Sequence, residues 1–278
     1  MHVLNIPVSP DVLARWAEWL APPMQPFFLS EAEATAFDLP TLVYAEWNPS
    51  PELRDTFALW GLSAAAHRVS LLSEADWNGL SLSVRRQLLR LQIAYGRGNL
   101  PRAKAFADLL PEPQRGRFVW WSSMLTPEIV ARAVSAESLA CQREQVPDAV
   151  WQAAEALLPR ARALAGTFAG GSGPNCFGTV MAAAGIAGAE LEWMQRDPFE
   201  AFLAARTRSG GKDDRPGTLL VWRGAGGQVE HAAVTLGGDW ALHKPSQSWM
   251  TPRVVLPTRA LIRAYRTPGH RLERHRLN

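Results

Sequence analysis

The segment GSGPNCFGTVMAAAG, residues 171–185, joins a glycine-rich loop to a run of small and apolar residues. Phe177 is followed by Val180 and Met181, three and four residues later, which is typical of one face of a buried helix. We therefore expect a helix that begins at or near Cys176. A thiol there meets unpaired backbone N–H groups and the positive end of the helix dipole, and both stabilise a thiolate. The same N–H groups can hold an oxyanion formed when a thiolate attacks a carbonyl.

The composition is that of an ordinary globular protein. The chain has 278 residues, of which 47% are hydrophobic and 20% charged, enough for one large domain or two modest ones. The net charge of +3 is small, and the arginines near the C-terminus are expected to form a solvated face, so we expect no nucleic-acid partner. No apolar run approaches the roughly 18 residues that a membrane helix needs, so we expect no membrane partner.

The first residues, MHVLNIPVSP, have neither the basic start nor the apolar run of a signal peptide. The two cysteines, Cys141 and Cys176, do not form a disulfide framework, and a reducing cytoplasm fits them best. We therefore expect a cytoplasmic protein, or one exported by a route that needs no signal peptide. Nothing in the sequence indicates the oligomeric state.

The first half of the chain reads as helices separated by proline-rich breaks. Ser30 and Glu33 have the spacing of a capping box at the start of a helix. Residues 51–69 form a further helical candidate, and residues 81–95, SLSVRRQLLRLQIAY, carry the clearest apolar stripe. These patterns predict an all-α N-terminal domain over residues 1–146, with no indication of its role.

The second half changes from helical to strand-like patterns. After the helix at residue 176, short runs rich in Val, Leu, Ala and Trp alternate with glycine turns and with a short helix near the end. These patterns predict a helix packed on an antiparallel sheet over residues 147–278, and hence an α+β fold for the whole chain. The expected strands are residues 217–223, 228–236, 239–245, 253–257 and 270–277.

Two histidines fall on neighbouring expected strands. His231 shares one strand face with small residues such as Ala233, which leave room for an approaching group. A three-residue loop from Gly237 to Asp239, or a bulge, would place His243 diagonal to His231 on that face. A two-residue loop would place it on the opposite face. The hypothesis that the two histidines cooperate therefore requires the longer loop or a bulge.

Cys176, His231 and His243 together match a thiol nucleophile, its general base and a residue that orients the base. Any single histidine is more often structural than catalytic, so the prediction depends on all three. The same side chains could also bind zinc, but a fourth ligand or a water would be required, and no spacing signals one. We therefore expect neither a metal nor another cofactor.

These segments resemble, in order and spacing, the NlpC/P60 cysteine peptidases, a papain-like family. Members carry a cysteine in a DCSG-type motif that opens a helix, then a strand starting PGDL, a strand such as HVGIYLG and a short strand such as GRMIHA. The resemblance covers roughly residues 148–278 and implies a papain-like domain with Cys176 as nucleophile, His231 as general base and His243 as orienting residue. The corresponding segments are NCFGTV (175–180), RPGTLLVW (215–222), EHAAVTLGG (230–238) and DWALHKP (239–245).

Two features depart from the family pattern. The Asp and Ser that flank the family's cysteine, and help recognise the free amino end of cell-wall stem peptides, are Asn175 and Phe177 here. The tyrosine of an upstream YxxGG run is absent, and Phe168 in that region has no hydroxyl to donate. The trio is kept while the usual substrate-reading residues are changed, which leaves the substrate open.

The leading hypothesis is a thiol-dependent hydrolase, a bacterial cysteine peptidase or amidohydrolase that cleaves peptidoglycan stem peptides or related small amides. A second hypothesis is an acyltransferase or transpeptidase that uses the same trio to pass an acyl group to an amine or lipid. A third is a degenerate papain-like domain that serves as a non-catalytic binding module. In that last case Cys176 would react slowly with iodoacetamide at neutral pH, because a working thiolate reacts quickly.

Overall fold

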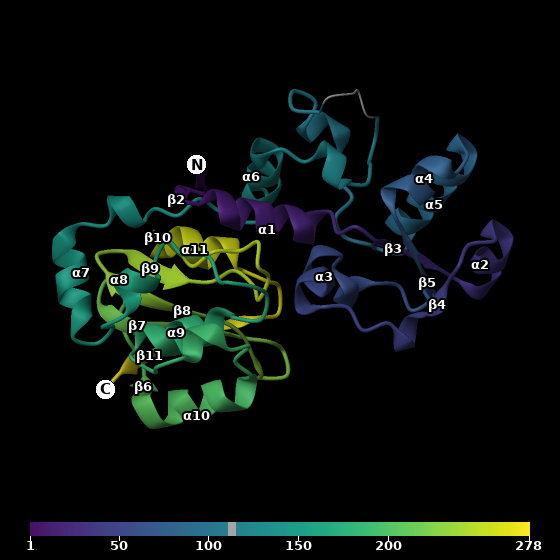
Figure 1. The fold of residues 1–278 in the computed structure, drawn as a ribbon. Coiled ribbons are helices and arrows are strands. Elements are labelled where there is room, and N and C mark those ends of the chain that lie inside the picture. The colour runs from purple at the N-terminus through teal and green to yellow at the C-terminus, as the bar shows by residue number, and fades with distance from the viewer. Residues whose placement is uncertain (111–114) are drawn as a thin grey trace. The chain divides into compact units, whose positions relative to one another are not determined.

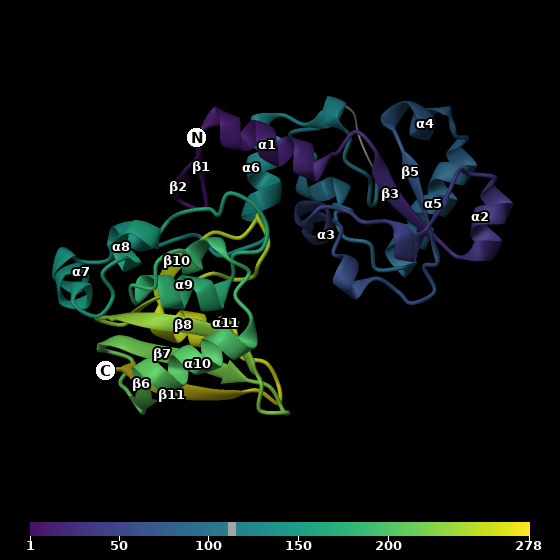
Figure 2. The same cartoon turned by 60° about the horizontal axis from the view of Figure 1, so that its bottom comes forward.

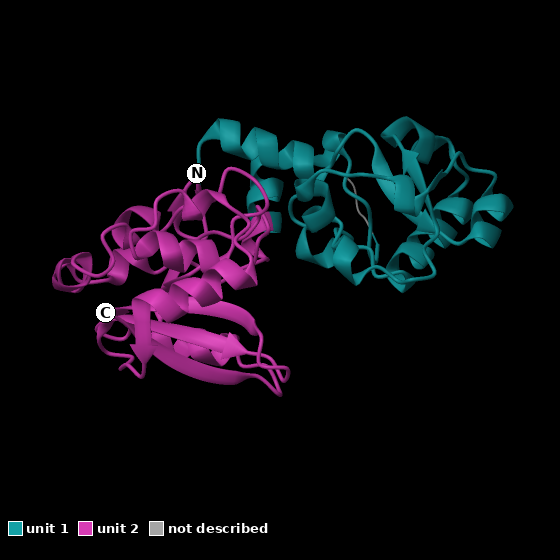
Figure 3. Ribbon diagram, turned by 90° about the horizontal axis from the view of Figure 1, so that it is seen from below, with its two compact units in different colours: residues 1, 8–133 teal, residues 2–7, 134–278 magenta. Residues whose placement is uncertain are grey.

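The computed structural model describes residues 1–110 and 115–278, and the chain forms two compact units (Figure 3). Unit 1 comprises Met1 and residues 8–133, and unit 2 comprises residues 2–7 and 134–278. The division differs from the expected boundary between residues 146 and 147, because the segment before that boundary bonds to the C-terminal sheet. The Gln142 N–H donates to Val255 O at 2.8 Å, and the Val255 N–H donates to Cys141 Sγ at 3.4 Å.

The N-terminal hairpin belongs to unit 2. Its strands are β1 (His2–Val3) and β2 (Ile6–Pro7), which pair antiparallel. Between them, Leu4 O accepts the Cys141 N–H at 2.9 Å, and Asn5 Nδ2 donates to Cys141 O at 3.1 Å. Unit 2 is therefore discontinuous in sequence.

Unit 1 contains short helices, several of which begin at a capping serine. The expected capping box is confirmed: Ser30 Oγ accepts the Glu33 N–H at 3.3 Å, and Glu33 Oε2 accepts the Ser30 N–H at 2.8 Å. The helix expected at residues 81–95 is confirmed as α5. The helices are α1 (Pro10–Leu20), α2 (Glu31–Phe37), α3 (Pro51–Thr56), α4 (Glu74–Gly79) and α5 (Leu82–Ala94), with α6 (Pro127–Ser135) crossing the boundary between the units.

Unit 1 also contains a sheet, so the prediction of an all-α first half is wrong. Strands β3 (Gln25–Leu29), β5 (Arg68–Leu72) and β4 (Leu42–Val43) form an antiparallel sheet in that order. The strand β3 follows a proline-rich break, and β5 overlaps a segment expected to be helical. Both are short apolar runs, in which periodicity alone does not separate a strand from a buried helix. Phe27 and Phe28 on β3 are completely buried in the core of unit 1.

Unit 2 is built on a six-stranded antiparallel sheet in the order β10-β9-β8-β7-β11-β6 (Figure 1). The five expected strands are present, and the chain as a whole is α+β. The third of them ends at His243, earlier than expected. The strands are β6 (Thr207–Ser209), β7 (Pro216–Arg223), β8 (Val229–Gly237), β9 (Trp240–His243), β10 (Val254–Pro257) and β11 (Arg271–Leu277).

Helices cover this sheet. The helix α9 packs against β8 and β9, and α10 packs beside α9 (Figure 2). Pro198 lies in the first turn of α10, where proline is tolerated because the backbone N–H groups there have no partner within the helix. Within the described residues, no helix combines the length and the apolar character needed to cross a membrane. The helices are α7 (Asp148–Glu155), α8 (Ala161–Leu164), α9 (Cys176–Ala183), α10 (Arg196–Arg206) and α11 (Thr258–Ala264).

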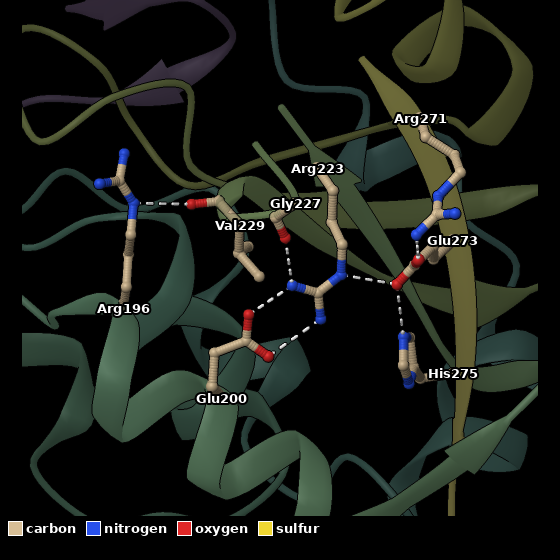
Figure 4. Close-up of polar contacts among 8 residues, drawn as sticks. All are labelled: Arg196, Glu200, Arg223, Gly227, Val229, Arg271, Glu273 and His275. Carbon is tan, nitrogen blue, oxygen red and sulfur yellow. Dashed lines mark hydrogen bonds and ion pairs between the residues drawn. The ribbon is translucent and has the colours of Figure 1, made fainter. Parts of the chain in front are cut away.

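Two arginines fix α10 to the sheet (Figure 4). At the end of β7, Arg223 donates to Glu200 Oε2 of α10 at 2.9 Å and to Glu273 Oε2 of β11 at 2.7 Å. The Arg223 side chain is only 15% exposed, so solvent screens these ion pairs less than ordinary surface pairs. Arg196, in the first turn of α10, donates from Nε to Val229 O on β8 at 2.9 Å. These contacts hold α10, and α9 beside it, in a fixed position on the sheet.

Gly178 allows α9 to lie directly against the 3₁₀ turn η6 (Ala189–Leu191). A Cβ atom at Gly178 would collide with the Ala189 carbonyl oxygen and come within 3.4 Å of Glu192 O. Both are backbone atoms, which cannot move away as the end of a flexible side chain can. The start of α9 is therefore tightly confined by its neighbours.

We predict that Gly178→Ala lowers the free energy of unfolding by about 1–3 kcal/mol, because α9 or η6 must move to admit the methyl group. Urea unfolding followed by circular dichroism measures the change. Gly170→Ala is the matched control, since nothing lies within 4 Å of a Cβ built there. Equal stability of the Gly178→Ala protein and the wild type would contradict the close approach described here.

Candidate active site

Cys176 is the first residue of α9, as the sequence predicted. The helix begins there because Asn175 caps it. Asn175 Oδ1 accepts the Gly178 N–H at 3.1 Å, and Asn175 Nδ2 donates to Met194 O at 2.7 Å. Asn175 is itself buried. Its amide therefore supports the helix start and ties it to the segment before α10.

The turn between β8 and β9 is one residue shorter than the three-residue loop that would place the two histidines on one face. Gly237 pairs with Trp240, so the loop has two residues, Gly238 and Asp239. Both have positive φ, 57° and 70°, which is the conformation of a tight two-residue hairpin loop. With regular pairing beyond it, this loop would have put His243 on the wrong face of the sheet.

A β-bulge restores the alignment that the two histidines require. The bulge lies just before Gly237, and beyond it Val234 pairs with Leu242. This is the register that a three-residue loop would have produced. His243 consequently lies on the same face as His231, and the requirement for a loop or a bulge is met by the bulge.

The two imidazoles form a hydrogen bond, with His231 Nε2 and His243 Nδ1 3.2 Å apart. Only 9% of His231 is exposed, and His243 is completely buried. His243 Nε2 is buried without a hydrogen-bond partner. For His231 to accept a proton at Nδ1, its Nε2 must carry the hydrogen and donate it to His243 Nδ1. His243 then carries its own hydrogen on the unpartnered Nε2.

Tyr265, which the sequence reasoning did not single out, covers the His231 ring. It directly follows α11, and the two rings are nearly parallel, with centroids 4.4 Å apart and planes at 7°. The Tyr265 ring also meets His243 edge-on at 4.9 Å. Trp222, the cross-strand partner of His231 on β7, contributes another ring contact at 5.3 Å. These aromatic contacts fix the plane of the His231 imidazole.

The thiol of Cys176 lies next to this pair. The backbone N–H groups of Ala232, Phe177 and Cys176 and the charge of Lys244 each lower the pKa of this thiol. Ala232 directly follows His231 on β8, and the charge of an ionised Cys176 acts on Tyr265, whose ring covers His231. No hydrogen bond joins Cys176 Sγ to the His231 ring in the described part of the chain.

Burial controls the charge state of the site. It raises the pKa of the Cys176 thiol to about 11, which outweighs the N–H groups and the Lys244 charge that act in the opposite direction. The N–H groups at the helix start therefore lower the pKa of the thiol, as expected, but burial raises it by more. Burial also lowers the pKa of His231 to about 3 and that of His243 well below 6.5. At neutral pH the thiol and both imidazoles are uncharged.

Lys244 places a buried amine directly after His243. Its Nζ donates to Ser246 O at 2.6 Å, to Ser248 O at 2.7 Å and to Thr251 Oγ1 at 3.0 Å. Three oxygen acceptors satisfy an ammonium group that water does not reach. The Lys244 charge opposes protonation of His243. This second residue was also missed from the sequence, because it carries no motif of its own.

A cavity of about 530 Å³ lies at the start of α9, and its volume is in the range of ligand sites, but Cys176, His231 and His243 are not among its lining residues. The residues on both sides of the cysteine line it, and so does Glu230, which precedes His231. Trp193, which is 59% exposed, forms part of the wall. The remaining lining residues include charged groups of both signs, Arg196 and Asp197.

Phe177 has a structural contact that explains its place beside the cysteine. Its ring stacks on Phe199 of α10, with centroids 4.6 Å apart and planes at 18°. The residue therefore packs α9 against α10 as well as lining the cavity.

Among the described residues, no group of three or more His, Cys, Asp or Glu side chains is arranged to hold a metal ion.

Comparisons with known proteins found no match to this chain: no protein-family model, no curated protein and no solved structure is significantly similar to it.

We predict that the protein loses stability as the pH falls from 7 to 5. The pKa values of His231 and His243 are lower in the folded protein than in the unfolded chain, so below pH 6.5 the unfolded chain binds more protons. The slope should approach ~1.4 kcal/mol per pH unit for each histidine. Urea unfolding at several pH values measures it, and His243→Gln should flatten the profile. An unchanged slope in that variant would contradict the attribution of the pH dependence to the buried histidines.

Proposed function

We propose that the protein is a thiol-dependent hydrolase that cleaves amide bonds, and that unit 2 is a papain-like domain of the NlpC/P60 type. The observation that carries the proposal is the His231–His243 hydrogen bond beside the helix start that bears Cys176. The bond occupies Nε2 of His231 and leaves Nδ1 for the thiol. A nucleophile, a base and an orienting residue are the three parts that such chemistry requires.

The charge states favour a mechanism that starts from neutral groups. His231 Nδ1 takes the proton from Cys176 Sγ as the sulfur attacks the carbonyl carbon, so no thiolate is needed in the resting enzyme. This transfer requires the thiol to come within hydrogen-bond distance of His231 Nδ1. The N–H groups near the sulfur, including that of Phe177, hold the oxyanion. His231 returns the proton to the leaving amine, and water then hydrolyses the thioester to release the acid and the free thiol.

The cavity at the start of α9 has the volume of a small-peptide site. Arg196, Asp197 and Glu230 line it, so charges of both signs are present there, and Arg196 and Glu230 form an ion pair at 2.8 Å. A short peptide presents an amino group and carboxylates, which these side chains can pair with. Peptidoglycan stem peptides and related small amides belong to this class, and we propose them as substrates.

Two observations favour alternative uses of the same site. The three residues are almost inaccessible to solvent, and Cys176 is only 6% exposed. Exclusion of water favours transfer of the acyl group to an amine over hydrolysis. The pKa of about 11 for Cys176 favours a non-catalytic binding module, in which the thiol never ionises. Activity assays with and without an added amine separate the three functions.

We predict that Cys176→Ala lowers the rate of muropeptide cleavage by at least about a thousandfold, because no other group can form the acyl-enzyme. Release of new amino groups, resolved by mass spectrometry, measures cleavage, and the same assay with an added amine detects transfer products. Cys141→Ala is the matched control. Cys141 is also buried, but its sulfur accepts a hydrogen bond from the Val255 N–H and is not part of the proposed trio.

Cleavage that persists in Cys176→Ala would overturn the proposal. Transfer products that exceed hydrolysis in the wild type would assign the acyltransferase function. A wild type that binds muropeptides, and gives neither product at any pH, would assign the binding module.

We predict that His243→Ala lowers kcat by about 10- to 100-fold with a smaller change in KM, because the His231 ring loses the acceptor for its Nε2–H. His243→Asn should retain more activity, since the Asn oxygen can accept the same hydrogen. Steady-state kinetics of the two variants provide the comparison. Equal kcat values for His243→Ala, His243→Asn and the wild type would show that His243 has no role in catalysis.

A further inference from the structure

A second cavity, in unit 1, is lined by arginines. It has a volume of about 550 Å³ and lies between α4, α5 and the segment that follows residue 114. Four arginines line it, and Glu74 is the one acidic residue in its lining. The four arginines are Arg85, Arg86, Arg115 and Arg117.

These arginines have no acidic partners in the described residues. None of the four forms an ion pair within residues 1–110 and 115–278. Glu74 accepts a hydrogen bond from Ser123 Oγ and forms no ion pair with any of the four. Among the described lining residues, four arginines thus stand against one carboxylate, which leaves an excess of positive charge.

Arg85 provides an independent observation that points to a ligand site. Its Nε is buried and has no hydrogen-bond partner. An unsatisfied buried donor on a charged group is costly, and native structures rarely leave one without a function or a bound molecule. Arg117 is held differently, because its Nη1 donates to Leu100 O at 2.5 Å, which positions the guanidinium at the cavity wall.

The rest of the lining is apolar and aromatic. Trp77 and Trp121 form part of the wall, and their rings are 6.1 Å apart. Trp77 also stacks on Phe27 of the unit core, with centroids 5.1 Å apart, so its indole is held in place. A rigid aromatic wall beside several guanidinium groups suits a ligand with an apolar or planar body and an anionic end.

We propose that this cavity binds a phosphorylated small molecule. A single carboxylate needs only one guanidinium, whereas four unpaired arginines match the several oxygens and the multiple charge of a phosphate or diphosphate group. The volume lies in the range of small-molecule sites. The proposal concerns unit 1 alone and does not depend on the chemistry at Cys176.

Isothermal titration calorimetry of the full chain tests this site, with ADP as the probe and adenosine as its uncharged partner. ADP should bind, and adenosine should not bind at the same concentration. Arg85→Gln and Arg86→Gln should each weaken ADP binding about tenfold, because each removes a charge-assisted contact. Arg90→Gln is the matched control: Arg90 lies on the same helix, is exposed and does not line the cavity. Raising the salt concentration should weaken ADP binding to the wild type, which tests the charge without any substitution.

Three results would overturn the proposal. The first is no binding of ADP at millimolar concentration, and the second is an Arg90→Gln variant that binds ADP as weakly as Arg85→Gln does. The third is a single-stranded oligonucleotide whose affinity exceeds that of ADP and grows with length, since this would indicate an extended nucleic-acid surface instead.

Discussion

The arrangement of the candidate active site depends on one irregularity in the pairing of β8 with β9. A tight turn with positive φ at Gly238 and Asp239 fixes the end of the hairpin, and the bulge beside it changes the register by one residue. Because side chains alternate between the faces of a strand, one residue of register decides whether two side chains meet. The bulge therefore determines that His231 and His243 share a hydrogen bond.

Burial gives this site its order and also its resting charge state. Tyr265 and Trp222 enclose the His231 ring, and the same packing removes the water that would stabilise an imidazolium or a thiolate. The site keeps a buried cation nearby, Lys244, whose ammonium group donates hydrogen bonds to three oxygen atoms. Precise geometry and a low tendency to ionise are thus two consequences of one packing arrangement.

The sequence predicts five strands of the unit 2 sheet, the start of α9 at Cys176 and the placement of His231 and His243 on neighbouring strands, because all of these depend on local patterns. The start of α9 at Cys176 follows from its apolar spacing, and the two histidines follow from strand alternation once a bulge is allowed. Tyr265 could not be found in this way, because its contact with His231 depends on how α11 returns to the sheet. The strands β3 and β5 were missed for another reason: their apolar runs are too short for periodicity to distinguish a strand from a helix. The raised pKa of Cys176 was missed because depth of burial, unlike a helix start, has no local signature.

The discontinuity of unit 2 has a consequence for the order in which the chain folds. The hairpin at residues 2–7 is synthesised before residues 8–133 of unit 1, whereas its partner Cys141 emerges after them. Unit 1 holds its own cores and sheet within residues 8–133, so it can fold before the hairpin contacts Cys141. Once unit 1 has folded, residues 8–133 no longer form a flexible loop between the hairpin and residue 134. This reduces the loss of chain entropy that closing so long a loop would otherwise require.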